Sequence, residues 1–278
     1  MKWATGWISN LALAILFGAL SSTPVNAETL VGFTQIGNTP ILVVMDSASP
    51  SNQSSFQSLR GVTTGQQLVA MDVRPATGEL FAVGVRTSAI QLYRINLTTR
   101  TAIPVGEPYT GLINPAGTQF GFDFNPMIDR VRLVSTAGQN LVFNPDTGAV
   151  TVATNLFYGP GDESEGEVPA VAHVAYDNNV AGTSVTQQRG IDAANGTLVT
   201  VANNLGTLGT IGPLGLQVTS IGGFDISGET GIGYAIIKPQ GNSVQLIYTI
   251  NLQTGQATAI SVPGFGFLEF RGLAVLPE

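Results

Sequence analysis

The 278-residue sequence contains no cysteine, a single histidine and few charged residues. The absence of cysteine excludes disulfide bonds, thiol nucleophiles and thiolate metal sites. Charged residues make up 10% of the chain, whereas a typical soluble domain has about 25%. The net charge is −7 and no run of basic residues occurs. Because nucleic-acid binding needs clustered cations to neutralise phosphates, nucleic acid is not an expected partner.

Apolar residues and glycine are abundant in the sequence. Hydrophobic residues make up 44% of the chain and 34 residues are glycine. A chain of this length and apolar content buries a sizeable core and does not have the composition of a disordered protein. The sequence therefore predicts a folded domain rich in turns.

The first 27 residues have the pattern of a secretory signal peptide. Lys2 supplies a positive charge, residues 11–20 are apolar, and Val25 and Ala27 fit the −3 and −1 positions of a signal-peptidase site. A membrane anchor is the alternative, but the apolar run is shorter than the roughly 20 residues that span a bilayer. We therefore predict cleavage after Ala27, export to the periplasm or the exterior, and one domain over residues 28–278 without a transmembrane segment.

Two sequence markers recur with a period of about 50 residues. The first is a turn that begins with Asn or Asp, and its copies lie at residues 46–50, 96–100, 144–148, 192–196 and 251–255. The second is a short apolar anchor, at residues 71–75, 122–126, 175–179, 224–228 and 273–277. In the last three copies a Gly stands four residues after the Asn or Asp. Asn or Asp can bind its own backbone two residues on, and Gly can adopt the positive φ that closes a hairpin, so we interpret the first marker as structural.

Each repeat unit predicts four short strands, which in the first full unit lie near residues 67–73, 79–85, 90–96 and 101–105. A four-stranded sheet repeated at this period is the unit of a β-propeller. Residues 270–276 leave room for one strand at the end of the chain, and the predicted strands at 30–35, 41–45 and 56–59 lack a fourth. We therefore predict an all-β propeller of five four-stranded blades, closed by pairing of the C-terminal strand with the N-terminal blade. An open β-sandwich, or two sandwiches, is the alternative.

A known family shares several of these segments. Residues 121–126, 129–135, 138–140 and 144–148 resemble the exported bacterial family filed as domain of unknown function 4394, and 159–162, 175–179 and 190–192 resemble its later motifs. The resemblance covers most of residues 30–276 and implies an exported, propeller-like bacterial protein, but no activity. Gln188 and Arg189 stand where the family has an aromatic or aliphatic pair, so we expect a more polar strand there.

The anchors supply the first candidate site. Asp72, Asp123 and Asp225 occupy the same place in three anchors, with Tyr176 at the equivalent place in a fourth. If these anchors are innermost strands, the carboxylates line the central channel, and Asn125 joins the same candidate set. A ring of carboxylates can hold Ca²⁺ through oxygen ligands. The alternative is that each Asp caps the turn that follows it in its own blade.

An acidic loop is the second candidate, with Asp162, Glu163, Glu165 and Glu167 close together. These carboxylates repel one another unless they are solvated or bind a cation, so the loop is a candidate Ca²⁺ site. Its spacing differs from that of the helix–loop–helix calcium motif. A solvated surface loop is the alternative.

The third candidate is a pair of arginines. Arg130 and Arg132 are two residues apart on a predicted strand and therefore share one face. They are a candidate channel site for an anionic ligand, or they form structural salt bridges with Asp123 or Asp129. His173 stands alone, which disfavours a zinc site, although a Ser-His-Asp triad requires only one histidine.

The sequence leaves three functions open. The favoured one is a non-catalytic, monomeric propeller that binds a small molecule, a glycan, a peptide or an envelope protein. A Ca²⁺-dependent hydrolase or lactonase is the alternative, and its channel ligands would come from Asp72, Asp123, Asn125, Asp225 and His173. A purely structural surface protein is the third. We name no catalytic residue and no other cofactor.

Overall fold

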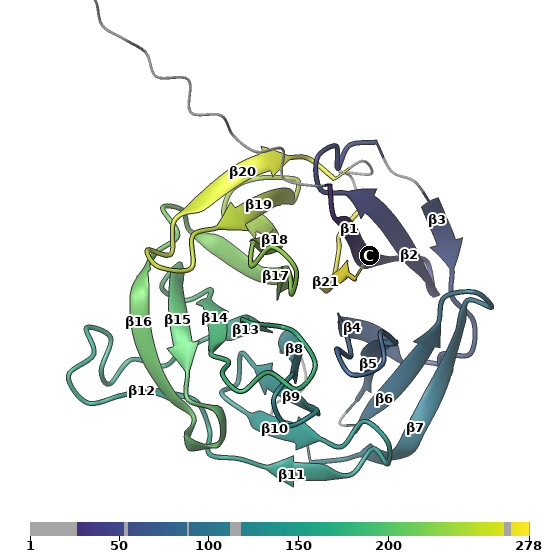
Figure 1. The fold of residues 1–278 in the computed structure, drawn as a ribbon, viewed down its shortest axis with the longest axis horizontal. Helices are drawn as coiled ribbons and strands as arrows, with labels where there is room; N and C mark the ends of the chain where they lie inside the picture. The colour runs from purple at the N-terminus through teal and green to yellow at the C-terminus, as the bar shows by residue number, and fades with distance from the viewer. Residues whose placement is uncertain (1–26, 53–54, 88, 112–117, 264–267, 278) are drawn as a thin grey trace, which may run out of the picture.

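Five sheets stand around a common axis in the computed structural model, which describes residues 27–52, 55–87, 89–111, 118–263 and 268–277 (Figure 1). Each sheet is one blade of a propeller, and its strands are numbered along the chain. The first blade contains β21 (Leu273–Leu276), β1 (Thr29–Ile36), β2 (Thr39–Asp46) and β3 (Ser55–Ser58). The second contains β4 (Gln67–Val73), β5 (Leu80–Arg86), β6 (Ala89–Asn96) and β7 (Thr101–Tyr109).

The other three blades follow the same order from the axis outward. The third contains β8 (Phe120–Asn125), β9 (Arg130–Ser135), β10 (Asn140–Phe143) and β11 (Val150–Val152). The fourth contains β13 (Val171–Tyr176), β14 (Gln188–Asp192), β15 (Thr197–Val201) and β16 (Thr207–Pro213), and β12 (Phe157–Tyr158) adds a parallel strand outside β16. The fifth contains β17 (Val218–Ile226), β18 (Gly233–Pro239), β19 (Leu246–Ile250) and β20 (Ala257–Ser261). The predicted five-bladed propeller is therefore confirmed.

The ring closes where the last strand meets the first. Strand β21 pairs antiparallel with β1, so that Leu276 lies opposite Thr29 and Leu273 opposite Gly32. This pairing completes the first blade and covers an edge of β1 that would otherwise be free to pair with another chain. The predicted closure is confirmed, although the strand begins at Leu273 and not at Phe270.

Phe270 is held by the fifth blade instead. Its N–H donates to Oε1 of Gln245 at 2.6 Å, and its carbonyl accepts from Nε2 of Gln245 at 3.0 Å. Its ring is fully buried and leaves no room for a side chain at Gly32, because a Cβ there would lie 2.9 Å from the ring. Strand β21 therefore begins beyond Phe270, whose ring packs against Gly32 of β1.

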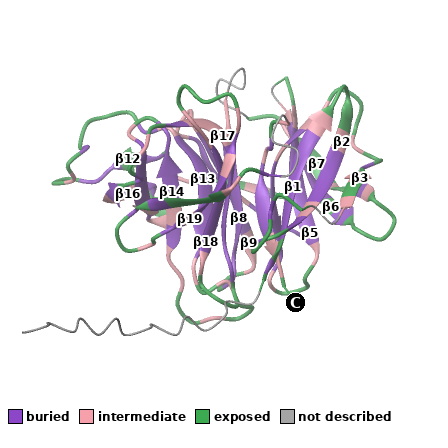
Figure 2. Cartoon of the chain, turned by 90° about the horizontal axis from the view of Figure 1, so that it is seen from above, coloured by how far each residue is buried: buried purple, intermediate pink, exposed green. Residues whose placement is uncertain are grey.

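The hydrophobic core fills the spaces between neighbouring blades, and exposure is concentrated in the loops at the two ends of the ring (Figure 2). One cluster joins Val31 and Phe33 of the first blade to Met71 of the second. Between the second and third blades, Phe81 and Phe124 meet edge to face with their ring centroids 5.3 Å apart. Because both faces of most strands are buried, each blade depends on its neighbours for a core.

The repeated turns have the structure that the Asn/Asp signal predicts. The Oδ1 of Asn144 accepts from the N–H groups of Asp146 and Thr147, and Gly148 adopts a φ of 72°. Asn251 and Gly255 repeat this arrangement in the fifth blade. A side-chain acceptor at the first position and a glycine in the left-handed region are what such turns require.

The five innermost strands, β21, β4, β8, β13 and β17, lie side by side around the axis, and each contacts the next. Residues on these strands therefore meet at the centre of the molecule although they are about 50 positions apart. Within the described ranges, no helix has the length and hydropathy needed to cross a membrane.

Candidate functional site

Three aspartates from different innermost strands converge on the axis. Asp72 lies on β4, Asp123 on β8 and Asp225 on β17. One carboxylate oxygen from each lies within 4.8 Å of the other two. Their side chains are at most 1% exposed. The structure thus gathers the three aspartates that the anchors align, and we call them the aspartate cluster.

Each of these carboxylates links its blade to the next one around the ring. The donors are backbone N–H groups of the neighbouring innermost strand: Phe124 to Oδ2 of Asp72 (2.8 Å), Tyr176 to Oδ1 of Asp123 (3.0 Å) and Val275 to Oδ2 of Asp225 (2.6 Å). Asp72 and Asp225 also accept, at 2.6 Å, from the N–H of the residue that follows each in the chain. The alternative prediction was that each aspartate caps the turn in its own blade. Instead, all three carboxylates accept hydrogen bonds from the next blade.

The turn after β8 is capped by Asn125 instead. Its Oδ1 accepts from the N–H of Met127 at 3.0 Å, and the residue is 6% exposed. Asn125 therefore has a structural partner within its own blade, which is the role that the alternative gave to the aspartates.

Burial sets the electrostatics of the aspartate cluster. It is the largest cause of the raised pKa of all three carboxyls, and the charges of the other members raise the pKa of Asp72 and Asp123 further. The pKa of Asp225 is raised to about 7, against the opposing effect of two N–H donors and with a contribution from Glu28. Oδ2 of Asp123 is buried and has no hydrogen-bond partner among the described residues. The cluster therefore holds more negative potential than its own donors balance.

Two voids flank the cluster along the axis. A cavity of about 360 Å³, here called the mouth cavity, opens where the innermost strands end, and Val73 and Val275 line it. The opposite void has only about 10 Å³ and is lined by Met71, Phe122 and Phe224, which directly precede the three aspartates. The cluster thus forms the boundary between an open cavity and a space of about one water molecule.

Glycine allows the innermost strands to approach so closely on the narrow side. A Cβ at Gly121 would lie 2.8 Å from the backbone nitrogen of Val174, and one at Gly223 would lie 2.3 Å from that of Leu273. His173 of β13 lines the same void. Its burial lowers the imidazole pKa to about 4, and its Nε2 has no partner among the described residues.

Tyr176 lies one position beyond the place predicted from the comparison of the repeated anchors. Its N–H donates to Asp123, as the N–H of Phe124 donates to Asp72, so Tyr176 corresponds to Phe124 and not to an aspartate. A β-bulge in β13, between Val171 and His173, interrupts the regular pairing with β14. The aspartate position is therefore taken by alanine in the fourth blade, at Ala175, and in the first, at Ala274.

Arg130 and Arg132 lie on β9, the second strand of the third blade, and not on an innermost strand. Arg132 is 2% exposed, and its guanidinium donates to neutral groups: Oη of Tyr176 (3.1 Å), Oδ1 of Asn140 (2.6 Å) and Oδ1 of Asn204 (2.7 Å). Arg130 donates to the carbonyl of Asp129 at 2.7 Å. The expected salt bridges with Asp123 or Asp129 were wrong for the described residues, because amide oxygens surround Arg132.

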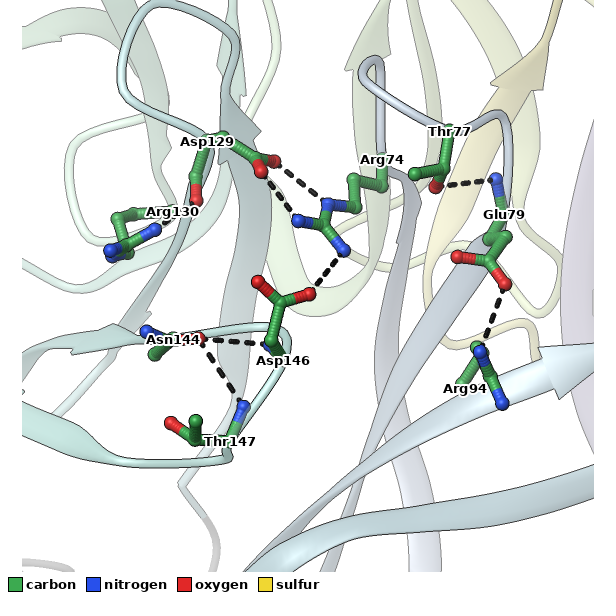
Figure 3. Close-up of polar contacts among 9 residues, drawn as sticks. All are labelled: Arg74, Thr77, Glu79, Arg94, Asp129, Arg130, Asn144, Asp146 and Thr147. Atoms are coloured by element: carbon green, nitrogen blue, oxygen red, sulfur yellow. Dashed lines mark hydrogen bonds and ion pairs between the residues drawn. The ribbon is translucent and has the colours of Figure 1, made fainter.

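Asp129 is bound by an arginine that the sequence did not single out. Arg74 donates from Nε and Nη2 to both carboxylate oxygens of Asp129, at 2.8 and 2.5 Å, and from Nη1 to Asp146 at 2.7 Å (Figure 3). The Asp129 hydrogen bonds, followed by those of Asp146, raise the pKa of Arg74 above its ordinary value in spite of burial. This clamp joins the second and third blades. The sequence did contain a sign of this clamp, because Arg74 lies inside a repeated anchor, directly after Val73.

The acidic loop binds its own backbone and that of a neighbouring strand. Asp162 accepts from the N–H and the hydroxyl of Thr210 on β16, at 2.6 and 2.9 Å, and from the N–H of Ser164 at 2.9 Å. Glu165 accepts from Gly161, Glu167 accepts from Asn195, and Glu163 is exposed. Of the described carboxylates, those in the aspartate cluster meet at distances suited to a metal, whereas the loop carboxylates do not.

Glu28 is a second residue that the sequence did not single out. Its carboxylate is 4% exposed and accepts from the hydroxyls of Ser227, Thr230 (3.1 Å) and Tyr234 (2.7 Å) in the fifth blade. Burial, followed by the hydrogen bond to Glu28, raises the pKa of Tyr234 to about 12. Glu28 lines the mouth cavity, so it connects the start of the first blade to the candidate site.

Several different proteins of known structure share this fold. TolB from Acinetobacter baumannii gives a TM-score of 0.51 at 11% identity, over 90% of this chain and 67% of that one. A structural genomics protein of unknown function from Bacteroides thetaiotaomicron VPI-5482 gives 0.51 at 11% identity, over 85% and 58%. A chain of a nidogen/laminin complex gives 0.52 at 8% identity, over 90% and 98%. At such identities the similarity shows the fold alone.

Sequence comparison assigns the family and no more. No curated protein matches the chain. The family model described as "Domain of unknown function (DUF4394)" matches residues 41–274, which is most of the propeller. The chain therefore belongs to this family, in agreement with the resemblance of its repeated segments.

Proposed function

We propose that this protein is an exported, non-catalytic propeller that binds a small ligand in the mouth cavity. The observation that carries the proposal is the cavity itself. Its volume of about 360 Å³ lies within the range of roughly 300–1,000 Å³ that is typical of ligand pockets. Three blades contribute to its rim around Val73, Asn179 and Ser227, and the first blade completes it through Glu28.

The lining favours a ligand that donates hydrogen bonds. Glu28, Glu229 and Asn179 are among the lining residues, and the described lining includes no lysine, arginine or histidine. Oδ1 of Asn179 is buried without a hydrogen-bond partner among the described residues. Val180 and Leu276 add apolar surface. We therefore expect a neutral or cationic ligand with hydroxyl or amino groups, and weak binding of anions because of repulsion from the carboxylates.

Binding without catalysis is the simpler interpretation of this lining. Acid–base catalysis requires a positioned group with a pKa near the working pH, most often histidine. His173 lines the narrow void and not the mouth cavity, and Asp225, whose pKa is raised to about 7, is not among the described lining residues of the mouth cavity either. The alternative, a Ca²⁺-dependent hydrolase or lactonase, would be favoured over our proposal by turnover of a lactone that is lost with chelator.

Export is part of the proposal, and the start of the fold supports it. Ala27 is exposed, whereas Glu28 is buried and its N–H donates to Oγ of Ser47 at 2.8 Å. The predicted cleavage site thus directly precedes Glu28, the first of the described residues that is anchored in the propeller. We expect N-terminal sequencing of protein from the periplasmic fraction to begin at Glu28. Protein that stays in the cytoplasm with residues 1–27 attached would contradict export.

A matched set of sugars tests the ligand class. We expect binding, measured by calorimetry, to follow the order glucosamine, glucose, glucuronate from strongest to weakest, because these pyranose sugars differ mainly in charge. Ala181→Trp fills the cavity from its exposed rim and should weaken glucosamine binding at least tenfold, whereas Val185→Trp, on an exposed position outside the lining, should not. Glucuronate binding as strongly as glucosamine, or glucosamine binding that Ala181→Trp leaves unchanged, would overturn the proposal.

A further inference from the structure

We propose that Asp72, Asp123 and Asp225 bind one Ca²⁺ ion at the centre of the propeller. One oxygen from each side chain lies within 4.8 Å of the other two. Ca²⁺–oxygen distances of about 2.3–2.6 Å place ligands on opposite sides of the ion roughly 5 Å apart, and neighbouring ligands closer together. The three oxygens therefore fit around one Ca²⁺ ion with the strands in their present positions. This site is independent of the ligand proposed for the mouth cavity.

The hydrogen bonds within the cluster point to a missing positive partner. Backbone N–H groups supply five donors to the three carboxylates. Oδ2 of Asp123 receives none of them, although the residue is fully buried. Because a buried charged oxygen without a partner is unfavourable, this atom is available as a ligand for a cation. The oxygens that accept one N–H keep a second lone pair for the same ion.

The surrounding charges do not supply that partner. None of the ion pairs among the described residues reaches the cluster, since Arg74 binds Asp129 and Asp146 and Arg132 binds neutral groups. Glu28 adds a further negative charge nearby. Three ionised carboxylates in this setting repel one another strongly. A divalent cation would reduce their net charge from −3 to −1.

The ligand atoms select Ca²⁺ among divalent cations. The cluster offers carboxylate oxygens, which suit hard cations and not those that prefer sulfur or imidazole. Mg²⁺ demands a near-ideal octahedron of ligands, whereas the carboxylates of the cluster are already oriented by backbone N–H groups. Ca²⁺ tolerates an irregular set of ligands. The mouth cavity provides the path of entry, because Val73 and Val275, whose N–H groups bind Asp72 and Asp225, line it.

Calorimetry on the full chain tests the site. Protein freed of metal with EDTA is titrated with CaCl₂, and a second sample is refolded in Ca²⁺, dialysed and assayed for bound metal, so that slow entry into a buried site does not hide binding. We expect one Ca²⁺ per chain and a rise in the melting temperature. Asp123→Asn keeps an oxygen for the N–H of Tyr176 but removes the charge, so it should weaken Ca²⁺ binding at least tenfold. Glu163→Gln, in the acidic loop, is the matched control and should leave binding unchanged.

Three results would overturn the Ca²⁺ site. The first is a folded wild-type protein that carries no Ca²⁺ after either procedure, which would mean that protons neutralise the cluster. The second is binding that Asp123→Asn leaves unchanged, and the third is binding that Glu163→Gln abolishes. If Asp123→Asn fails to fold, Asp72→Asn replaces it and is judged by the same tenfold criterion. None of these results depends on glucosamine binding, so the mouth-cavity proposal stands or falls separately.

Discussion

The molecule gathers acidic residues in two places, and their carboxylates have different partners. In the aspartate cluster, the carboxylates lie on three blades, are buried and face one another. In the acidic loop, they lie within a few residues of each other, and Asp162 uses both of its oxygens to bind Thr210 and Ser164. Three of the four loop carboxylates thus have local donors, whereas the cluster leaves Oδ2 of Asp123 without one among the described residues.

The pKa values of the two regions differ in the same sense. Burial raises the pKa of Asp72, Asp123 and Asp225. Burial also acts to raise the pKa of Asp162, but the hydrogen bonds from Thr210 and Ser164 outweigh it and lower the pKa below its ordinary value. Density of acidic residues along the sequence is therefore a poor guide to a cation site. What matters is whether the fold supplies enough donors for the oxygens that it buries.

Removing a member of the aspartate cluster gives the largest expected effect. Asp225→Ala leaves the N–H groups of Val275 and Ile226 without their acceptor, at the junction with the closing strand β21. We expect a loss of about 2–5 kcal/mol in the free energy of unfolding, measured with urea, because each unpaired buried donor costs about 1–3 kcal/mol.

Two variants control this measurement. Asp225→Asn keeps one acceptor and should fall between Asp225→Ala and the wild type. Glu163→Ala removes an exposed carboxylate of the acidic loop and should change stability by no more than about 0.5 kcal/mol. Equal effects of Asp225→Ala and Glu163→Ala would remove the distinction between the two regions.

The pH dependence of stability tests the raised pKa values of the aspartate cluster. A carboxyl group with a raised pKa binds more protons in the folded than in the unfolded state, so its contribution is present at low pH and is lost as the pH rises. For Asp225 this window runs from about 4, the ordinary value, to about 7. Asp72, Asp123 and Glu28 are the charged groups that face Asp225. In EDTA, we expect the melting temperature of the wild type to fall between pH 5 and pH 7.5. Saturating Ca²⁺ should flatten or reverse that slope, and a slope that Ca²⁺ does not alter would argue against the cation site.

His173 acts in the opposite direction and has to be separated from this effect. Its pKa is about 4 in the folded protein, below the ordinary 6.5, so its contribution to stability is present above pH 6.5 and is lost as the pH falls toward 4. We compare the free energy of unfolding at pH 5 with that at pH 7.5, both in EDTA. His173→Gln should shift this difference in favour of pH 5 by roughly 1–2 kcal/mol relative to the wild type. An unchanged difference between the two pH values would show that the imidazole is not held neutral by burial.

The sequence determined much of the fold but less of the site. The period of the anchors was sufficient to predict five blades and closure by the C-terminal strand, because each unit repeats the same strands and turns. The same repeats predicted that Asp72, Asp123 and Asp225 are equivalent. The position of Tyr176 was wrong by one residue, because the spacing between anchors varies and the sequence does not show which anchor residue donates to the carboxylate of the neighbouring blade.

The charge pairings were less predictable for a physical reason. Arg132 is close in sequence to Asp129, but Asp129 binds Arg74, from a different blade and 55 positions away. Partners across a blade interface depend on side-chain direction in three dimensions, and a one-dimensional spacing does not contain it. The mouth cavity was unpredictable for the same reason, because its lining comes from several turns that meet only when the ring closes.

The acidic loop provides the smallest expected effect and the last test of the comparison. Asp162→Ala removes two hydrogen bonds that hold the loop to Thr210 of β16 and one to Ser164 within the loop, and Asp162 is only partly buried. We expect a loss of about 1 kcal/mol in the free energy of unfolding and faster hydrogen exchange at the N–H of Thr210. Ca²⁺ binding should stay as in the wild type, because the loop carboxylates act through hydrogen bonds to the protein. A lower Ca²⁺ affinity in Asp162→Ala with an intact aspartate cluster would instead make the loop the cation site.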